Sequence, residues 1–151
     1  MFTTLYRSAA AWTGVGLASG LFYRELTKHN AFTGQTQLSV VHTHTLVLGT
    51  VMLLLLLGLN AMLRLDLDRR FRWGILTWNI GLTLTAGGML VKGVFQVLQN
   101  AAADSPAIAG VSGLGHIVLT LAFVLIFLAI GARAKTLTDT PAQAGEQQLA
   151  V

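Results

Sequence analysis

Two histidines lie inside a long apolar stretch of the chain. His42 and His44 come just after the start of the run from Leu38 to Leu63. A membrane-spanning helix needs about 20 apolar residues, and this run is long enough. An imidazole at membrane depth is costly unless it binds or pairs with something. Because each helical residue turns by about 100°, residues two apart point about 200° away from each other. We therefore expect His42 and His44 to address two different partners, one on each side of the helix.

The composition is that of an integral membrane protein. Of the 151 residues, 54% are hydrophobic and only 11% are charged, which is too apolar for a soluble domain of this size. The lipid bilayer is therefore the first expected partner. The chain has no cysteine, which excludes disulfides, thiolate metal sites and iron–sulfur clusters. The net charge of +4 does not indicate nucleic acid binding, because the basic residues stand at the ends of apolar runs and form no patch.

Four apolar runs predict an all-α fold, an integral membrane four-helix bundle. The spans are expected at about residues 5–26, 38–63, 73–98 and 106–134. The four-span domain would cover residues 1–135, and residues 136–151 would form a polar, disordered cytoplasmic tail. In the first span, small residues recur every four positions in two rows, which predicts close helix packing. The rows are Ala10, Gly14 and Ala18, and Gly16 and Gly20.

The basic residues predict how the chain is oriented in the membrane. Four spans put both termini and the loop between the second and third spans on one side. Seven Lys and Arg residues lie on that side and two, Arg24 and Lys28, lie on the other. The excess of positive charge marks the cytoplasmic side. We therefore expect a multi-pass protein with both termini in the cytoplasm.

The ionisable residues inside the spans gather at one depth. His42 and His44 would lie roughly 6–10 Å below the outer surface, and His116 somewhat deeper. Lys92 approaches the same level from the other side. It belongs to a stripe of polar and small residues on one face of the third span, which indicates a face turned to protein or to a cavity. The stripe consists of Gly81, Thr85, Gly88, Lys92, Gln96 and Gln99.

This cluster favours a haem b site. Histidines on facing helices can ligate haem iron, and an apolar pocket at lipid level suits the macrocycle. The two propionates need cations or hydrogen-bond donors near the water. We expect these groups to come from Lys92, Arg24, Gln96 and Gln99. Two alternatives stay open. One is a copper or zinc site or a proton relay using His42, His44, His116 and Lys92, although the opposed directions of the pair argue against a metal site within one chain. The other is a structural subunit whose histidines only join helices.

Two phrases carry a resemblance to known proteins. Residues 16–25, GLASGLFYRE, and 37–44, QLSVVHTH, resemble a family of small prokaryotic four-span membrane proteins of unassigned function. This likeness covers nearly the whole chain except the tail, and it implies the prokaryotic cytoplasmic (inner) membrane. More distantly, the pair His42 and His44 resembles the His-x-His of the catalytic subunit of haem–copper oxidases. In that subunit, twelve spans form three arcs of four helices, and the second helix of an arc offers two histidines to two haems.

The second resemblance implies an assembly. One four-span chain would correspond to one arc, so a homotrimer would rebuild the twelve-helix ring, with haem b at each subunit interface. His42 of one protomer and His44 of its neighbour would be the axial ligands, with His116 in reserve. The chain lacks the histidines and the tyrosine of the oxidase copper centre, which argues against oxygen reduction and leaves open whether it is an enzyme. Ligation by two histidines favours electron transfer with a redox partner that the sequence does not identify.

Overall fold

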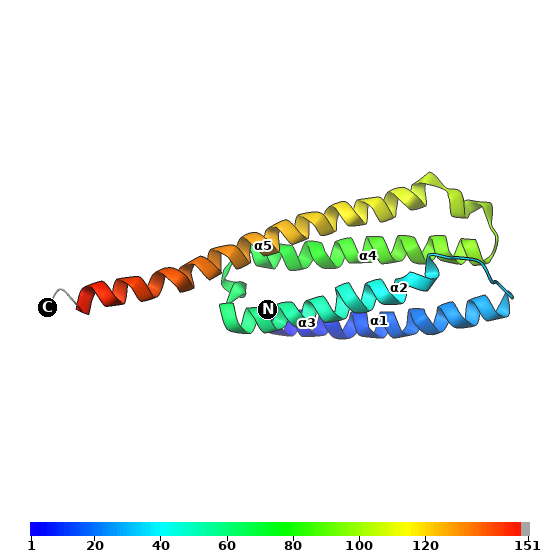
Figure 1. Ribbon diagram of the computed structural model, residues 1–151. Coiled ribbons are helices and arrows are strands. Elements are labelled where there is room, and N and C mark those ends of the chain that lie inside the picture. The colour runs from blue at the N-terminus through cyan, green and yellow to red at the C-terminus, as the bar shows by residue number, and fades with distance from the viewer. Residues whose placement is uncertain (149–151) are drawn as a thin grey trace.

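Four long helical stretches run back and forth beside one another (Figure 1). The structure, a computed structural model, describes residues 1–148, with the side chains of residues 1–137. The described part is entirely helices and short connections, as the all-α prediction requires. The elements are α1 (Phe2–His29), α2 (Leu38–His44), η1 (Thr45–Val51), α3 (Met52–Leu63), η2 (Leu65–Leu67), α4 (Arg69–Val97), η3 (Ala101–Asp104) and α5 (Pro106–Gln148).

Three of the stretches are long and apolar enough to cross a membrane. They are Leu38–Leu63, which comprises α2, η1 and α3, then α4, and the part of α5 from Pro106 to Leu137. This confirms a multi-pass membrane protein and three of the expected spans. The 28-residue α1 is not among them, because glycine, serine, threonine and Arg7 dilute its apolar content. The first predicted span, and with it the fourth membrane crossing, stays a prediction.

The helices form a row that is open between α1 and α5. α1 packs along α2, η1 and α3, α4 packs against α2 and η1, and α5 packs along almost the whole of α4 (Figure 1). α1 also touches α4, and α5 touches the end of α3. Within the described residues, α1 and α5 make no contact with each other. In a closed four-helix bundle the first and last helices would touch. The bundle expected from the sequence is therefore open at one side.

Small residues set the close approach of α4 and α5. A Cβ added at Gly88 would clash with Ser112, and one added at Gly115 would clash with Thr85 of α4. Gly81 also packs against α5, where its missing side chain leaves room for the backbone. Rows of small residues allow such contacts between helices in lipid. The predicted stripe on α4 therefore faces protein over its inner half, as expected, and there it packs against a helix.

Larger side chains fill the space between the other helices. The indole of Trp78 is fully buried, and the ring of Phe123 meets it edge to face, with 4.7 Å between the ring centres. A second apolar cluster lies toward the other end of the molecule, where Leu38 and Val41 of α2 pack against Met89. The backbone of Leu38 comes so close to Gly93 of α4 that no side chain would fit there. These contacts fix where the histidines of α2 stand.

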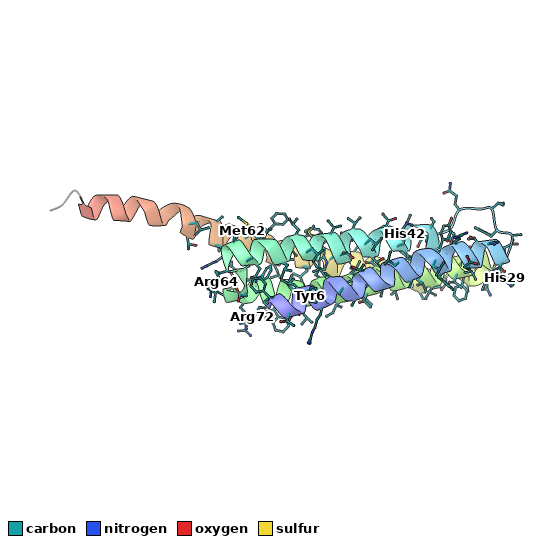
Figure 2. The ribbon with its side chains drawn as sticks, turned by 90° about the horizontal axis from the view of Figure 1, so that it is seen from below. Tyr6, His29, His42, Met62, Arg64 and Arg72 are labelled. Carbon is teal, nitrogen blue, oxygen red and sulfur yellow. The ribbon has the colours of Figure 1, made fainter. Side chains whose placement is uncertain are left out.

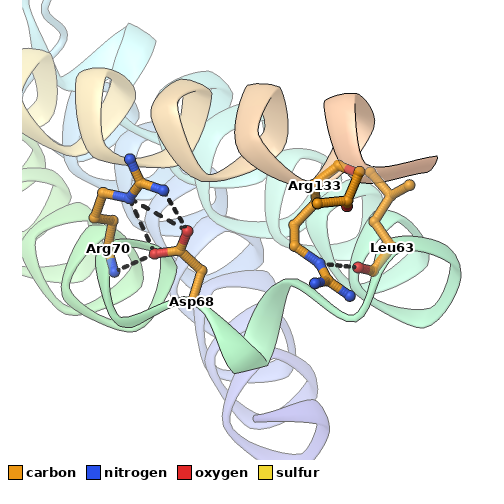
Figure 3. A network of polar contacts seen from close by, with 5 residues as sticks. Leu63, Asp68, Arg70 and Arg133 are labelled. Carbon is orange, nitrogen blue, oxygen red and sulfur yellow. Dashed lines mark hydrogen bonds and ion pairs between the residues drawn. The ribbon is translucent and has the colours of Figure 1, made fainter. Parts of the chain in front are cut away.

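The arginine-rich end is closed by polar contacts between chain segments (Figure 3). Asp68 caps α4 by accepting a hydrogen bond from the Arg70 backbone N–H at 2.8 Å, and its carboxylate also binds the Arg70 guanidinium. The Nε of Arg133 on α5 donates to the Leu63 carbonyl at the end of α3, at 3.0 Å. Both interactions satisfy polar groups at helix ends, which otherwise lack partners.

The chain continues as helix beyond the third apolar span. α5 runs through Gln148, so the boundary expected between residues 135 and 136 falls inside one helix. The predicted disordered tail, residues 136–151, lies almost wholly outside the residues whose side chains are described. That part of the domain prediction stays a prediction.

Candidate cofactor site

His42 and His44 leave α2 on opposite flanks. The buried residues Val41 and Thr45 mark the face of α2 that is turned to the protein. His42 follows Val41 by about 100° around the helix and His44 by about 300°, so one lies on each side of the buried face. Both side chains are partly exposed. Figure 2 shows His42 in the half of the molecule nearer His29 and far from Arg64 and Arg72.

The His42 ring lies against α1. Its Cβ and Cγ are 3.6 and 3.7 Å from the point where a Cβ on Gly20 would stand, so the glycine row of α1 accommodates the imidazole. The Nε2 of His42 is 3.3 Å from Thr43 Oγ1. Its Nδ1 is buried and has no hydrogen-bond partner among the described residues. A buried polar atom without a partner lowers the stability of the folded state by about 1–3 kcal/mol. A ligand or another hydrogen-bond partner at this nitrogen would remove that cost.

The His44 ring is held by its own helix. Its Nδ1 is 3.1 Å from the Val40 carbonyl oxygen, and in the neutral ring it can donate its hydrogen there. The lone pair of Nε2 is then free. His116 on α5 has the same arrangement, with Nδ1 2.8 Å from the Ser112 carbonyl oxygen. Histidines that bind metals are commonly oriented in this way, one nitrogen donating to a carbonyl and the other ligating.

A π-helical segment follows the pair directly. In η1 the Leu48 carbonyl accepts a hydrogen bond from Trp78 Nε1 at 3.0 Å. Gly49 lies tightly against the side chain of Trp12, whose Nε1 donates to Asn79 Oδ1 at 2.9 Å. Segments of π-helix occur mostly as single turns and frequently at functional sites. Here the segment joins α1, η1 and α4 just beneath the histidines.

These supporting residues were missed at the level of sequence. Trp12, Trp78 and Asn79 belong to no motif, yet the chemistry of their side chains carries a signal. All three have a polar hydrogen-bonding group in the middle of a long helix, where such a group needs a partner. The π-helix itself has no sequence signature in the run from Thr45 to Val51, because its residues are ordinary for an α-helical span.

His116 lies deeper than the pair and is not beside it. Gly93 of α4 contacts Leu38, and Gly88 of α4 contacts Ser112. These two glycines are five residues, or about 7.5 Å, apart along α4. His116 follows Ser112 by four residues, just as His42 follows Leu38, so His116 lies about 7.5 Å deeper than His42. This is the expected order of depths. α4 separates α5 from α2, however, and His116 is exposed on the outer side of the row.

Arg24, one of the predicted propionate partners, lies near His42 along α1. It stands one helical turn, about 6 Å, along α1 from Gly20, which contacts His42. Its side chain is exposed, and its nearest carboxylate oxygen, on Glu25, is 3.9 Å away. The arginine therefore sits between His42 and the end of α1.

The three other candidates have structural surroundings of their own. Gln96 Oε1 accepts a hydrogen bond from the Gln37 backbone N–H at 2.7 Å, which supports the start of α2. Gln99 is exposed and takes a left-handed conformation, with φ of 52°, as α4 ends. Lys92 follows Gly88 by one turn and so lies on the α5 side of α4, about 100° from the neighbouring Gly93 that contacts α2. Contacts of these three with a cofactor stay predictions.

His42 and His44 do not share a site within one chain. Among the described residues, no three His, Cys, Asp or Glu side chains come together as a metal site. Two imidazoles with uncommitted ring nitrogens instead stand on opposite flanks of one helix. If two imidazoles were to hold one haem, each imidazole of this chain would need its counterpart on another helix.

Fold and hydropathy together define an all-α, multi-pass membrane protein. The chain belongs to the DUF2871 family of proteins of unknown function, whose family model matches residues 2–133. This match bears out the predicted membership of a family without an assigned function. Neither a search of curated proteins nor a search of solved structures found a match. The likeness to the haem–copper oxidase subunit is therefore a prediction that no solved structure supports.

Proposed function

We propose that this protein binds haem b in the membrane and transfers electrons, with each haem held between two protomers of a homotrimer. His42 of one protomer and the neighbour's copy of residue 44 are the axial ligands. When bound, the haem would supply one-electron redox chemistry. The protein supplies the two imidazoles, the apolar surroundings and a cation near the propionates. Ligation on both faces leaves no open iron position, so the proposed role is electron transfer.

One observation carries the proposal. Two imidazoles leave α2 on opposite flanks, and each has a ring nitrogen without a hydrogen-bond partner among the described residues. In His44 this is Nε2, and in His42 it is the buried Nδ1, which would reach a shared haem iron only if the ring turned. A purely structural histidine would satisfy its buried nitrogen with a neighbouring helix. On the neighbouring α1 the His42 ring lies against Gly20, which has no side chain to hydrogen-bond.

The open row of helices supports the trimer. In a ring, each subunit presents one flank to the neighbour on its left and the other flank to the neighbour on its right. The opposed histidines match that requirement. The row Ala10, Gly14 and Ala18 on α1 is exposed, and nothing lies within 4 Å of a Cβ placed on Gly14, so this surface is free for another subunit.

The proposal also fixes an orientation in the membrane. α1 lies alongside the Leu38–Leu63 span and matches it in length, so we include it as the fourth crossing (Figure 1). Both termini then lie in the cytoplasm of a prokaryotic inner membrane, together with the arginine-rich end. The histidines lie in the outer half of the membrane.

The test is the visible spectrum of protein purified after expression with ample haem. The wild type is expected to show a Soret band and, after reduction, the sharp bands of a bis-histidine haem. His42→Ala and His44→Ala are each expected to abolish them. His29→Ala is the matched control, because His29 is exposed at the end of α1, and it should bind haem normally.

Two outcomes would point to the alternatives. A colourless wild type with bound copper or zinc would replace the proposal with the non-haem metal site. A colourless, metal-free wild type whose histidine variants only lose stability would leave a structural membrane subunit.

A further inference from the structure

A chain of hollows follows one face of α4 from the arginine-rich end toward the middle of the molecule. The first has a volume of about 490 Å³ and is lined by Arg69, Arg72, Trp73 and Leu76. The second, of about 430 Å³, shares Arg72 and Leu76 with the first, reaches Asn79, and is lined on its other side by Met1, Thr4 and Ser8 at the start of the chain. The third, of about 260 Å³, begins at Asn79 and is lined further by Ile80, Thr83 and Leu84. The second hollow shares Arg72 and Leu76 with the first and Asn79 with the third, so the three lie end to end along α4, and we refer to them together as the groove.

The groove changes in character along its length. Its first part carries two guanidinium groups beside an indole, and the rest is largely apolar. Neither Arg69 nor Arg72 forms an ion pair with a described residue, whereas the neighbouring Arg70 is paired with Asp68. Among the described residues that line the groove there is no carboxylate. The two positive charges are therefore free to meet an anion.

The length of the groove matches one leaflet of a bilayer. From Arg69 to Leu84 the helix rises by about 22 Å at 1.5 Å per residue. Half of a bilayer with its head groups measures about 20–22 Å. Trp73 is half exposed and stands one residue from Arg72, at the level where tryptophan prefers the membrane interface. Figure 2 shows Arg72 at the same end of the molecule as Tyr6 and Arg64.

We propose that this groove binds an anionic phospholipid. Its phosphate lies between Arg69 and Arg72, beside Trp73, and one acyl chain follows α4 past Leu76 toward Thr83. Guanidinium groups bind phosphate through paired N–H donors, and basic pockets at the cytoplasmic end of transmembrane helices recognise acidic head groups. The site lies at the opposite end of the protein from the histidines and does not depend on haem binding.

The experiment compares lipid retention by the full-length protein in detergent, using native mass spectrometry. The probes are phosphatidylglycerol, which is anionic, and phosphatidylcholine, which is zwitterionic with chains of the same length. The wild type is expected to retain phosphatidylglycerol in preference. The double variant Arg69→Gln, Arg72→Gln is expected to bind it about 30-fold more weakly. The matched control Arg7→Gln, Arg64→Gln removes two exposed arginines from the same end but outside the groove, and should leave binding unchanged.

A third variant tests the apolar part. Thr83→Trp fills the groove without changing any charge and is expected to lower phosphatidylglycerol retention. The proposal is overturned if the control weakens binding as much as the double variant, since general surface charge would then explain the preference. It is also overturned if Thr83→Trp leaves lipid retention intact and instead alters the oligomeric state, since a second copy of the chain would then occupy the groove.

Discussion

His42 has features of both a structural side chain and a ligand-binding side chain. Its ring packs against Gly20 as a structural side chain would, yet its Nδ1 is buried without a partner. The sequence predicted that His42 and His44 point in opposite directions, because that follows from helical geometry alone. It could not predict which nitrogen of each ring would be engaged, because that depends on the Val40 carbonyl and on the neighbouring helix.

Gln96 has surroundings that the sequence did not predict. It lies near the C-terminal end of α4, and its side-chain oxygen accepts a hydrogen bond from the backbone of Gln37. Its expected role as a propionate partner stays a prediction. The loop between α1 and α2 brings Gln37 and Gln96 together over a long sequence separation. Such a tertiary contact leaves no periodic trace in the sequence.

Asp68 gives a prediction that is independent of any cofactor. The hydrogen bond from the Arg70 side chain lowers the pKa of Asp68 below its ordinary value of 3.8. Asp68 therefore stabilises the folded state above about pH 4, and that contribution is lost as the pH falls through the lower pKa of the folded protein. Asp68→Ala also removes the N-cap of α4 and should cost about 1 kcal/mol at neutral pH. Thermal unfolding in detergent at pH 7 and at pH 3 measures both effects.

The control for this prediction is Asp104→Ala, which removes an exposed carboxylate from the other end of the molecule. It should leave the unfolding temperature nearly unchanged. An Asp68→Ala protein as stable as the wild type at pH 7 would show that the cap has no energetic role.

At the scale of elements, η1 is the largest departure from expectation. The run from Leu38 to Leu63 was expected as one regular helix, and the ends of that run agree with the structure. Its middle is π-helical because Trp78 binds the Leu48 carbonyl and Trp12 packs on Gly49. Both tryptophans come from other helices, so the local sequence of the span could not indicate the change.

Gly49→Ala tests the importance of this segment. The added methyl group would overlap the Trp12 side chain near its backbone, so we expect a loss of about 1–3 kcal/mol of stability. Gly58→Ala is the matched control in the same span, where nothing lies within 4 Å of the added methyl group. It should be neutral or stabilising by up to about 1 kcal/mol. Equal effects of the two substitutions on thermal unfolding would contradict the proposed packing of η1.

The stripe on α4 shows what the spacing of residues in the sequence can predict about a helix face and what it cannot. The spacing of Gly81, Thr85 and Gly88 correctly predicted a face turned away from lipid. Periodicity cannot distinguish a face that packs on a helix from one that lines a cavity. The contacts with Ser112 and Gly115 show that the inner half of the stripe packs on a helix, α5.

At the scale of the whole molecule, sequence reasoning found the helices but not their arrangement. Length and hydropathy were enough for the positions of three spans, since a bilayer demands long apolar segments. The open row depends on which helix faces pack together, and the hydropathy of each span does not specify this. The separation of the histidine site from the arginine-rich end, in contrast, follows directly from the topology (Figure 2).

The account depends on each haem being shared between protomers, and co-expression of two variants tests this directly. In the proposed trimer, assemblies of His42→Ala protomers alone or of His44→Ala protomers alone would each lack one of the two iron ligands. In randomly mixed trimers, one interface in about four pairs an intact His42 with an intact His44. We predict that the mixture recovers about a quarter of the wild-type Soret absorbance per protomer. If the wild type binds haem but the mixed trimers remain colourless, haem is not shared in this way and the proposed ligand pair is wrong.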